Sequence, residues 1–455
     1  MEYSQLKNII KDEDRVILGD QIEKVYLTDG LGLEYGEADA LVFVKNTNEV
    51  IDVIKFANKN LIPVTPRGAG TCLTGASIPT KRGIILDLSK MNNILELDEE
   101  NLNIIIEPGV LLKDLQGYVE SKNLFYPPDP GEKTSTIGGN ISTNAGGMRA
   151  VKYGVTRDYV RELEIVSGDG TVIKVGSKTI KNSSGLDLKD IVIGSEGTLG
   201  IITKITLKVI PKPAESVSVL IPFDNLETGV NCISKIIKSN SKPTAIEFME
   251  NNIVENSEKF VELKLPCKKG NAYLLLTFDG EEDEIVSNIN RTKEVVINNG
   301  ALDFRKLSEE EALNAWTIRG ALASSICYNN EQVPIDIVVP INKISEFVEF
   351  TNECGKKHDV QVIYFGHAGD GNIHVSAIRN FMENNEWKRR THNLLNELYK
   401  KSDEFNGLPS GEHGIGLTKK EYFENVTEDI NLEYMKGIKN IFDKNNILNT
   451  GKVYC

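Results

Sequence analysis

The chain has 455 residues, of which 40% are hydrophobic and 26% are charged, a composition typical of a soluble globular protein with a large core. Its formal net charge of -14 argues against nucleic-acid binding, because an acidic surface repels phosphate backbones. No apolar run approaches the roughly 18 residues that span a bilayer, and the polar residues 1–14 predict no secretory signal. Six scattered cysteines, none in a Cys-x-x-Cys pair, argue against an iron–sulfur cluster or a zinc knuckle and favour a reducing cytoplasm, with Cys455 as an exposed thiol.

The first two hundred residues alternate short β-rich runs with turns and helices. Thr47 is the expected N-cap of a helix whose apolar residues recur on one face. Strands are expected over residues 41–45, 62–65, 84–87 and 103–107. This pattern predicts an α+β domain over residues 1–212.

Pro211 and Pro213 mark a domain boundary, because two prolines in three residues cannot continue a helix or a central strand. The following residues 213–408 alternate helices and strands in an order that predicts a second α+β domain on an antiparallel sheet. We expect helices over 225–239, 281–298 and 427–445, and a further helix that follows the strand at 335–340 and ends at Lys356. Strands are expected over 272–279, 335–340 and 361–365.

Three glycine-rich stretches occur in the first domain, at residues 66–75, 135–147 and 194–202. The first has neither the lysine of a Walker loop nor the third glycine of a Rossmann fingerprint, and taken alone it favours a simple glycine-rich turn. Glycines let backbone N–H groups approach a ligand closely. Three such loops in one domain therefore predict a long ligand lying against backbone, such as a dinucleotide.

These stretches, together with residues 144–160, closely resemble the FAD-linked oxidase family. The resemblance is to the vanillyl-alcohol-oxidase or PCMH type of flavin fold, in the branch of the D-lactate dehydrogenases and the catalytic subunit of glycolate oxidase. It covers nearly the whole chain. It implies a PCMH-type FAD-binding domain (1–212), a cap or substrate domain (213–408) and a C-terminal segment (409–455) that returns to the flavin.

The resemblance implies that the first loop holds the FAD pyrophosphate and that the other two line the adenosine and flavin. Some relatives bind flavin covalently through a histidine in the first loop, and residues 67–75 contain none, which predicts non-covalent FAD. The implied FAD-binding residues are Pro66, Arg67, Gly68, Ala69, Gly70, Thr71, Gly75, Thr136, Gly138, Gly139, Asn140, Ser142, Gly146, Glu196, Gly197, Gly200, Ile201, Ile202 and Asn449.

Three of the five histidines lie in two short motifs, residues 366–374 and 410–416. Turn residues between two strand-like runs predict a hairpin that brings His367 and His374 together. With Glu412 they could form a divalent-metal site with open positions, although two hydrogen-bonded hairpin histidines would give the same pattern. The family resemblance implies metal (Zn, Fe or Mn) on these three residues and His413 as general base. His358 and His392 are expected on the surface.

A 2-hydroxy acid also needs a cation for its carboxylate, and the resemblance implies Arg319, although an arginine exposed on a helix would look the same. Ser376 is a weaker candidate for substrate contact. Relatives specific for hydroxyglutarate or malate add a threonine and a lysine where this chain has Ala323 and Pro334. Their absence favours a small monocarboxylate.

The resemblance thus implies FAD-dependent oxidation of a 2-hydroxy monocarboxylate, with D-lactate as the expected substrate and glycolate as its rival. Electrons would pass to an external acceptor, with an electron-transferring flavoprotein expected ahead of iron–sulfur subunits or quinone. Two other classes are considered. A non-catalytic flavin-binding accessory subunit should lack the metal and base motifs, and a non-redox enzyme such as alkylglycerone-phosphate synthase would leave the histidine motif unexplained.

Overall fold

The computed structural model describes residues 3–328 and 330–455, except for the side chain of Cys327. Residues 1–2 of the polar N-terminal stretch therefore lie outside the description. The chain folds into two compact units. The first comprises residues up to Ala145, Val155–Lys212 and Glu412–Cys455, and the second comprises Gly146–Gly154 and Pro213–Gly411. Within the described part of the chain, no helix has both the length and the apolar character needed to cross a membrane.

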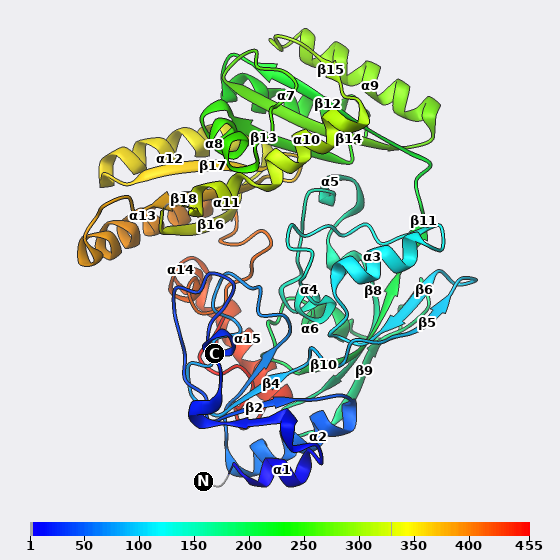
Figure 1. Cartoon of the computed structure of the whole chain (residues 1–455), viewed down its shortest axis with the longest axis vertical. Helices are drawn as coiled ribbons and strands as arrows, with labels where there is room; N and C mark the ends of the chain where they lie inside the picture. The colour runs from blue at the N-terminus through cyan, green and yellow to red at the C-terminus, as the bar shows by residue number, and fades with distance from the viewer. Residues whose placement is uncertain (1–2, 329) are drawn as a thin grey trace. The chain divides into compact units, whose positions relative to one another are not determined.

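The first unit is built on two main sheets (Figure 1), and β7 and β11 form a further two-stranded antiparallel sheet. The smaller has the order β1-β2-β4-β3, in which β2, β3 and β4 are parallel and β1 is antiparallel to β2. The larger is antiparallel, in the order β5-β6-β10-β8-β9. The strands are β1 (Val16–Leu18), β2 (Ala40–Phe43), β3 (Val64–Arg67), β4 (Ile84–Asp87), β5 (Ile94–Asp98), β6 (Asn103–Ile106), β7 (Leu124–Phe125), β8 (Val160–Val166), β9 (Val172–Gly176), β10 (Ile201–Lys208) and β11 (Ile210–Pro211).

The main core of the first unit lies between its smaller sheet and α2 (Thr47–Asn60). The predicted apolar face of this helix is buried, through Val50, Val53, Ile54 and Ala57. The predicted N-cap was wrong by one residue. Asn46 is the cap, because its side chain accepts the Glu49 N–H and an amide oxygen serves this role as well as a hydroxyl does. The other helices are α1 (Gln5–Ile9), α3 (Leu112–Glu120), α4 (Ile137–Thr143), α6 (Leu188–Val192), α14 (Lys420–Val426) and α15 (Asp429–Phe442).

The second unit is built on one seven-stranded sheet in the order β15-β12-β14-β13-β17-β18-β16. Every neighbouring pair in it is antiparallel, which confirms the predicted α+β fold with an antiparallel sheet. The strands are β12 (Glu215–Phe223), β13 (Ala245–Glu250), β14 (Ala272–Gly280), β15 (Arg305–Lys306), β16 (Gln332–Val338), β17 (Gln361–His367) and β18 (Asn372–Ile378).

Apart from the short α5, the helices of the second unit form two groups. In one, α7 contacts α9 and α12, and α12 lies alongside α13 (Figure 1). In the other, α8 contacts both α10 and α11 over a core that includes Met249, Leu275 and Phe365. The helices are α5 (Ala150–Tyr153), α7 (Leu226–Lys238), α8 (Asn251–Val261), α9 (Glu282–Ile297), α10 (Glu309–Gly320), α11 (Leu322–Cys327), α12 (Ile344–His358) and α13 (Asn384–Glu404).

Candidate active site

Two histidines meet on the hairpin formed by β17 and β18. His367 is the last residue of β17, and His374 is the third residue of β18. Their ring centroids are 5.0 Å apart and their planes are nearly perpendicular, at 87°. Gly371 makes the intervening turn possible, because its φ of +85° lies in the left-handed region that glycine tolerates. The predicted hairpin and the predicted proximity of the two imidazoles are therefore confirmed.

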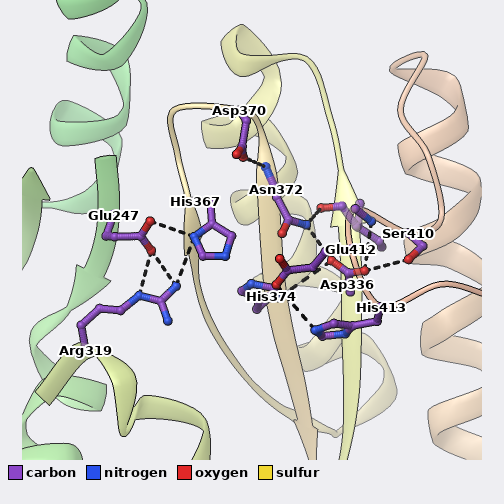
Figure 2. Close-up of polar contacts among 12 residues, drawn as sticks. Glu247, Arg319, Asp336, His367, Asp370, Asn372, His374, Ser410, Glu412 and His413 are labelled. Atoms are coloured by element: carbon purple, nitrogen blue, oxygen red, sulfur yellow. Dashed lines mark hydrogen bonds and ion pairs between the residues drawn. The ribbon is translucent and has the colours of Figure 1, made fainter. Parts of the chain in front are cut away.

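Each histidine has a buried carboxylate directly opposite it on the neighbouring strand. Glu247 of β13 pairs with His367, and Asp336 of β16 pairs with His374. Both carboxylates are fully buried. Directly opposed residues point to the same face of a sheet, so the four side chains share one face. Figure 2 shows Glu247 facing His367.

Glu247 fixes the tautomer of His367. Its Oε1 lies 2.8 Å from His367 Nδ1, so a neutral imidazole donates its Nδ1 proton to this carboxylate and keeps Nε2 as an electron-pair donor. Burial alone would raise the pKa of Glu247, but the charge of Arg319 and the hydrogen bond with His367 outweigh it and hold the pKa below its usual value. Glu247 is therefore a buried anion.

Asp336 organises the other side of the pair. It accepts hydrogen bonds from Asn372 Nδ2 at 2.7 Å, Ser410 Oγ at 2.8 Å and the Gly411 N–H at 3.0 Å (Figure 2). Its Oδ1 lies 3.9 Å from His374 Nδ1, an ion-pair distance rather than a hydrogen bond. No sequence motif indicated Glu247 or Asp336, because an acidic residue inside a strand carries no signal until the register is known.

Arg319 is a buried residue of α10, not an arginine exposed on a helix. Its Nε and Nη2 contact Glu247 Oε2 at 2.8 and 2.6 Å, and its Nη2 lies 3.4 Å from His367 Nδ1. Its guanidinium also stacks over Phe365, 5.3 Å from the ring centroid. Within the described residues, Nη1 is the guanidinium nitrogen without a hydrogen-bond partner. The predicted role of Arg319 in binding substrate remains a prediction.

Glu412 and His413 open the last segment of the first unit. His413 is anchored by its carbonyl oxygen, which accepts a hydrogen bond from Thr74 Oγ1 in the first glycine loop at 3.3 Å. Its Nε2 lies 3.8 Å from Glu412 Oε1. Glu412 directly follows Gly411, and the Gly411 N–H donates a hydrogen bond to Asp336. Glu412 is therefore the next residue along the chain from this contact.

The three glycine-rich loops converge in the first unit. A Cβ on Gly68 would lie 2.2 Å from Thr136 Oγ1, and one on Gly197 would lie 2.5 Å from Pro66 Cγ. The Glu196 N–H donates to Ser142 O at 2.7 Å. The loops thus touch one another through backbone and small side chains, a surface that fits a dinucleotide. Of the residues predicted to bind FAD, all lie in the first unit except Gly146, which belongs to the second unit.

Two of these predicted residues use their side chains to shape the loops. Arg67 is buried and donates to the carbonyl oxygens of Thr28 and Val25, both at 2.7 Å. Glu196 accepts the N–H groups of Ile415 and Gly416 at 2.7 and 2.9 Å, which binds the C-terminal segment to the third loop.

The C-terminal residues return to the first loop. Asn449 donates to the carbonyl oxygens of Ala76 and Glu196 at 3.1 and 2.7 Å. Lys452, which no sequence motif indicated, donates to Ala76 O and to Asn449 Oδ1, both at 2.7 Å. Burial lowers the pKa of Lys452 to about 7. A buried amine with a shifted pKa beside these loops marks a candidate functional position.

The remaining predicted residues have mixed outcomes. Ser376 lies in β18, two residues after His374 and therefore on the same face of the sheet. His392 is exposed, as predicted. The prediction that His358 is a surface residue was wrong, since its side chain is only 13% exposed and Glu397 contacts it. Cys455 is also partly buried, against the cluster that contains Tyr454, so it is not an exposed thiol.

Comparison with known proteins supports this description. The profile "FAD binding domain" matches residues 38–176, and "FAD linked oxidases, C-terminal domain" matches residues 212–453. A D-lactate dehydrogenase of Anaerostipes hadrus is 44% identical over 96% of this chain and 94% of its own. The glycolate oxidase subunit GlcD of Bacillus subtilis is 36% identical over 95% of this chain and 92% of its own. The structure of p-cresol methylhydroxylase shares the fold, with a TM-score of 0.82 and 16% identity over 99% of this chain and 96% of its own.

The fold, the glycine loops and these matches define an FAD-dependent oxidoreductase with a PCMH-type flavin-binding fold. The chain belongs to the family of FAD-linked oxidases. The family resemblance inferred from the sequence is therefore confirmed.

Proposed function

We propose that this enzyme oxidises a small 2-hydroxy monocarboxylate, with D-lactate as the preferred substrate, to the 2-oxo acid. One observation carries the proposal. Two imidazoles lie side by side on one sheet face, each opposite a fully buried carboxylate. The carboxylate bonded to His367 Nδ1 leaves Nε2 of that ring with a free electron pair, as in histidines bound to metal, and Asp336 lies 3.9 Å from Nδ1 of His374.

The donor set fits a divalent metal such as Zn, Fe or Mn. His367, His374 and Glu412 would hold it, and three protein ligands leave positions open for a substrate. Support for Glu412 comes from the backbone, since its neighbour Gly411 is bound to the carboxylate that faces His374. A bound divalent ion lowers the pKa of a substrate hydroxyl, and bound FAD accepts a hydride at N5.

The chain's own residues position the substrate and remove its proton. His413 takes the proton from the substrate hydroxyl oxygen, because imidazole is the side chain best suited to general-base catalysis near neutral pH. Arg319 binds the substrate carboxylate through its Nη1 edge, while Nε and Nη2 remain on Glu247. Fixing the carboxylate in this way decides which face of C2 is presented to the flavin.

The preference for a monocarboxylate rests on two residues and one relative. Ala323 and Pro334 supply neither a hydroxyl nor an ammonium group for a second substrate carboxylate. The Anaerostipes hadrus relative, which matches along nearly its whole length, is named D-lactate dehydrogenase. Glycolate is the second candidate, because the Bacillus subtilis relative is named as a glycolate oxidase subunit.

Further parts of the proposal concern the cofactor and its reoxidation. FAD is bound non-covalently, because residues 67–75 offer no histidine for a flavin bond. Electrons pass to an external acceptor, an electron-transferring flavoprotein or another redox subunit, since the chain contains no Cys-x-x-Cys pair for a cluster. We place the reaction in the cytoplasm, where unpaired cysteines stay reduced.

The test is anaerobic reduction of the purified yellow enzyme by single 2-hydroxy acids. D-lactate should bleach the flavin. L-lactate presents the wrong face of C2, and the second carboxylate of D-2-hydroxyglutarate has no partner, so each should act at least about tenfold more slowly, a difference of about 1.4 kcal/mol or more. Faster bleaching by glycolate than by D-lactate would reverse the order of the two candidates. A flavin that none of these acids reduces would contradict the proposal and favour an accessory or non-redox role.

A further inference from the structure

A thiol, an imidazole and a carboxylate meet between two helices of the second unit, in a cluster that the proposed reaction does not use. Cys354 and His358 belong to α12, and Glu397 belongs to α13. Cys354 Sγ lies 3.6 Å from Glu397 Oε2, and His358 Nε2 lies 2.8 Å from Glu397 Oε1. One candidate ligand atom from each residue lies within 4.8 Å of the others.

Helix geometry explains why these side chains meet. Cys354 and His358 are four residues apart, so they lie one above the other on the same helix face. That face is turned toward α13, which lies alongside α12 (Figure 1). Glu397, in the middle of α13, completes the group from the opposite side. Two rigid helices rather than a loop therefore hold all three side chains.

The spacing is close to what a tetrahedral metal requires. Zinc bonds of about 2.0–2.3 Å place neighbouring ligand atoms about 3.3–3.8 Å apart. The Sγ to Oε2 distance of 3.6 Å already lies in this range. The His358 to Glu397 hydrogen bond, at 2.8 Å, would have to open by less than about 1 Å to admit the ion.

The charges of the group also fit a divalent ion. A thiolate and a carboxylate together offset two positive charges, and the imidazole is neutral when it binds a metal. In this structure the ammonium group of Lys357 supplies the positive charge beside Glu397, because its Nζ lies 2.9 Å from both carboxylate oxygens. The side chain of Lys357 is 64% exposed, so it can turn into solvent when a metal takes its place.

The structure assigns a second metal site to Cys354, His358 and Glu397, and we propose that it binds zinc with water as the fourth ligand. The sulfur ligand favours zinc over magnesium, calcium or manganese, which prefer oxygen. Zinc binding to His358 Nε2 requires that the ring proton now shared with Glu397 move to Nδ1, and the thiol proton of Cys354 is released to solvent as the sulfur to zinc bond forms. The site would tie the end of α12 to α13.

The experiment measures zinc bound per chain by equilibrium dialysis of the holoenzyme. Cys354→Ala and His358→Ala should each bind one zinc fewer than the wild type, with unchanged flavin reduction by D-lactate. Matched controls are Cys232→Ala, a buried helix cysteine, and His392→Ala, an exposed helix histidine, and both should keep the wild-type zinc content. Equal zinc content in all five proteins would overturn the assignment.

A second measurement covers the case in which a variant fails to fold. Alkylation of Cys354 in the wild-type enzyme is followed by mass spectrometry with and without zinc. At a zinc concentration about ten times the Kd, the free thiol falls to about one tenth, so alkylation should slow by about tenfold. Glu397→Gln should weaken this protection. A rate that zinc leaves unchanged would show that the three residues form only a network of hydrogen bonds and ion pairs.

Discussion

Glu247 Oε1 lies 2.8 Å from His367 Nδ1, and the two residues are direct cross-strand partners on β13 and β17. The same carboxylate accepts both bonds of the Arg319 guanidinium edge. One buried anion thus orients a proposed metal ligand and the proposed substrate-binding arginine together. Disturbing Glu247 should therefore affect metal binding and substrate binding together.

Glu247→Gln should lower metal affinity by about 10–100-fold, because the amide no longer holds His367 in one tautomer as a carboxylate does. It should also cost about 3–5 kcal/mol of unfolding free energy, since the buried charge of Arg319 loses its partner. Metal content after dialysis and urea unfolding check the two effects. Glu255→Gln, an exposed glutamate of α8, should change neither.

A double variant separates the two effects. Glu247→Leu with Arg319→Met replaces the buried ion pair by apolar side chains and should recover most of the lost stability. It should not recover metal affinity or flavin reduction, because nothing then orients His367 or binds the substrate carboxylate. Recovery of activity along with stability would argue against both proposed roles.

The His413→Ala variant should still bind FAD. Reduction of its flavin by D-lactate should be about 10²–10⁴-fold slower than in the wild type, because a general base usually contributes a factor of this size. Stopped-flow bleaching under anaerobic conditions measures this rate. His392→Ala is the matched control and should behave as the wild type, because His392 is an exposed residue of α13. Rapid bleaching in the His413 variant would assign the proton transfer to another residue.

Removal of the divalent ion with a chelator should abolish flavin reduction by D-lactate while the yellow colour stays with the protein. The two groups are proposed to be held by different residues, so loss of one should leave the other bound. Activity should return on addition of a single divalent metal, and the most effective metal identifies the resident ion. Full activity in enzyme shown by elemental analysis to be free of metal would refute the metal site.

Gly70→Ala should weaken FAD binding by about tenfold or more. The φ of Gly70 is +73°, which costs an L-residue about 1–2 kcal/mol, and a Cβ there would lie 2.0 Å from Arg67 Nη2. Arg67 cannot easily move, because it is bonded to Thr28 and Val25. Fluorescence titration of the apoprotein with FAD measures the effect. Gly131→Ala, where a Cβ meets nothing within 4 Å, should bind FAD normally.

Lys452 should make the stability of the apoprotein depend on pH. Its pKa is lowered from 10.5 to about 7 in the folded chain, so between these values the unfolded chain binds a proton that the folded chain lacks. The unfolding free energy should therefore rise with pH across this window, by at most about 1.4 kcal/mol per pH unit. The stability difference between wild type and Lys452→Met should show this slope. Lys436→Met, at an exposed position, should parallel the wild type.

Local patterns in the sequence were sufficient for much of the fold and part of the site. The apolar face of α2 follows from helical periodicity, and strand β4 formed over the predicted residues. The turn residues between β17 and β18 predicted a hairpin, and that hairpin alone brings His367 and His374 together. These features depend on neighbours only a few residues apart, so no knowledge of the rest of the fold is needed.

Long-range strand pairing decided the rest. Glu247 is 120 residues from His367, and the pairing of β13 with β17 cannot be deduced from either strand alone. Tertiary contacts also buried Arg319 against Glu247 and left the side chain of His358 only 13% exposed, between α12 and α13. The sequence by itself determined which chemical groups the chain carries and which of them are close neighbours. The tertiary structure decided which carboxylate is the cross-strand neighbour of each imidazole, because burial and sheet register are set by the whole chain at once.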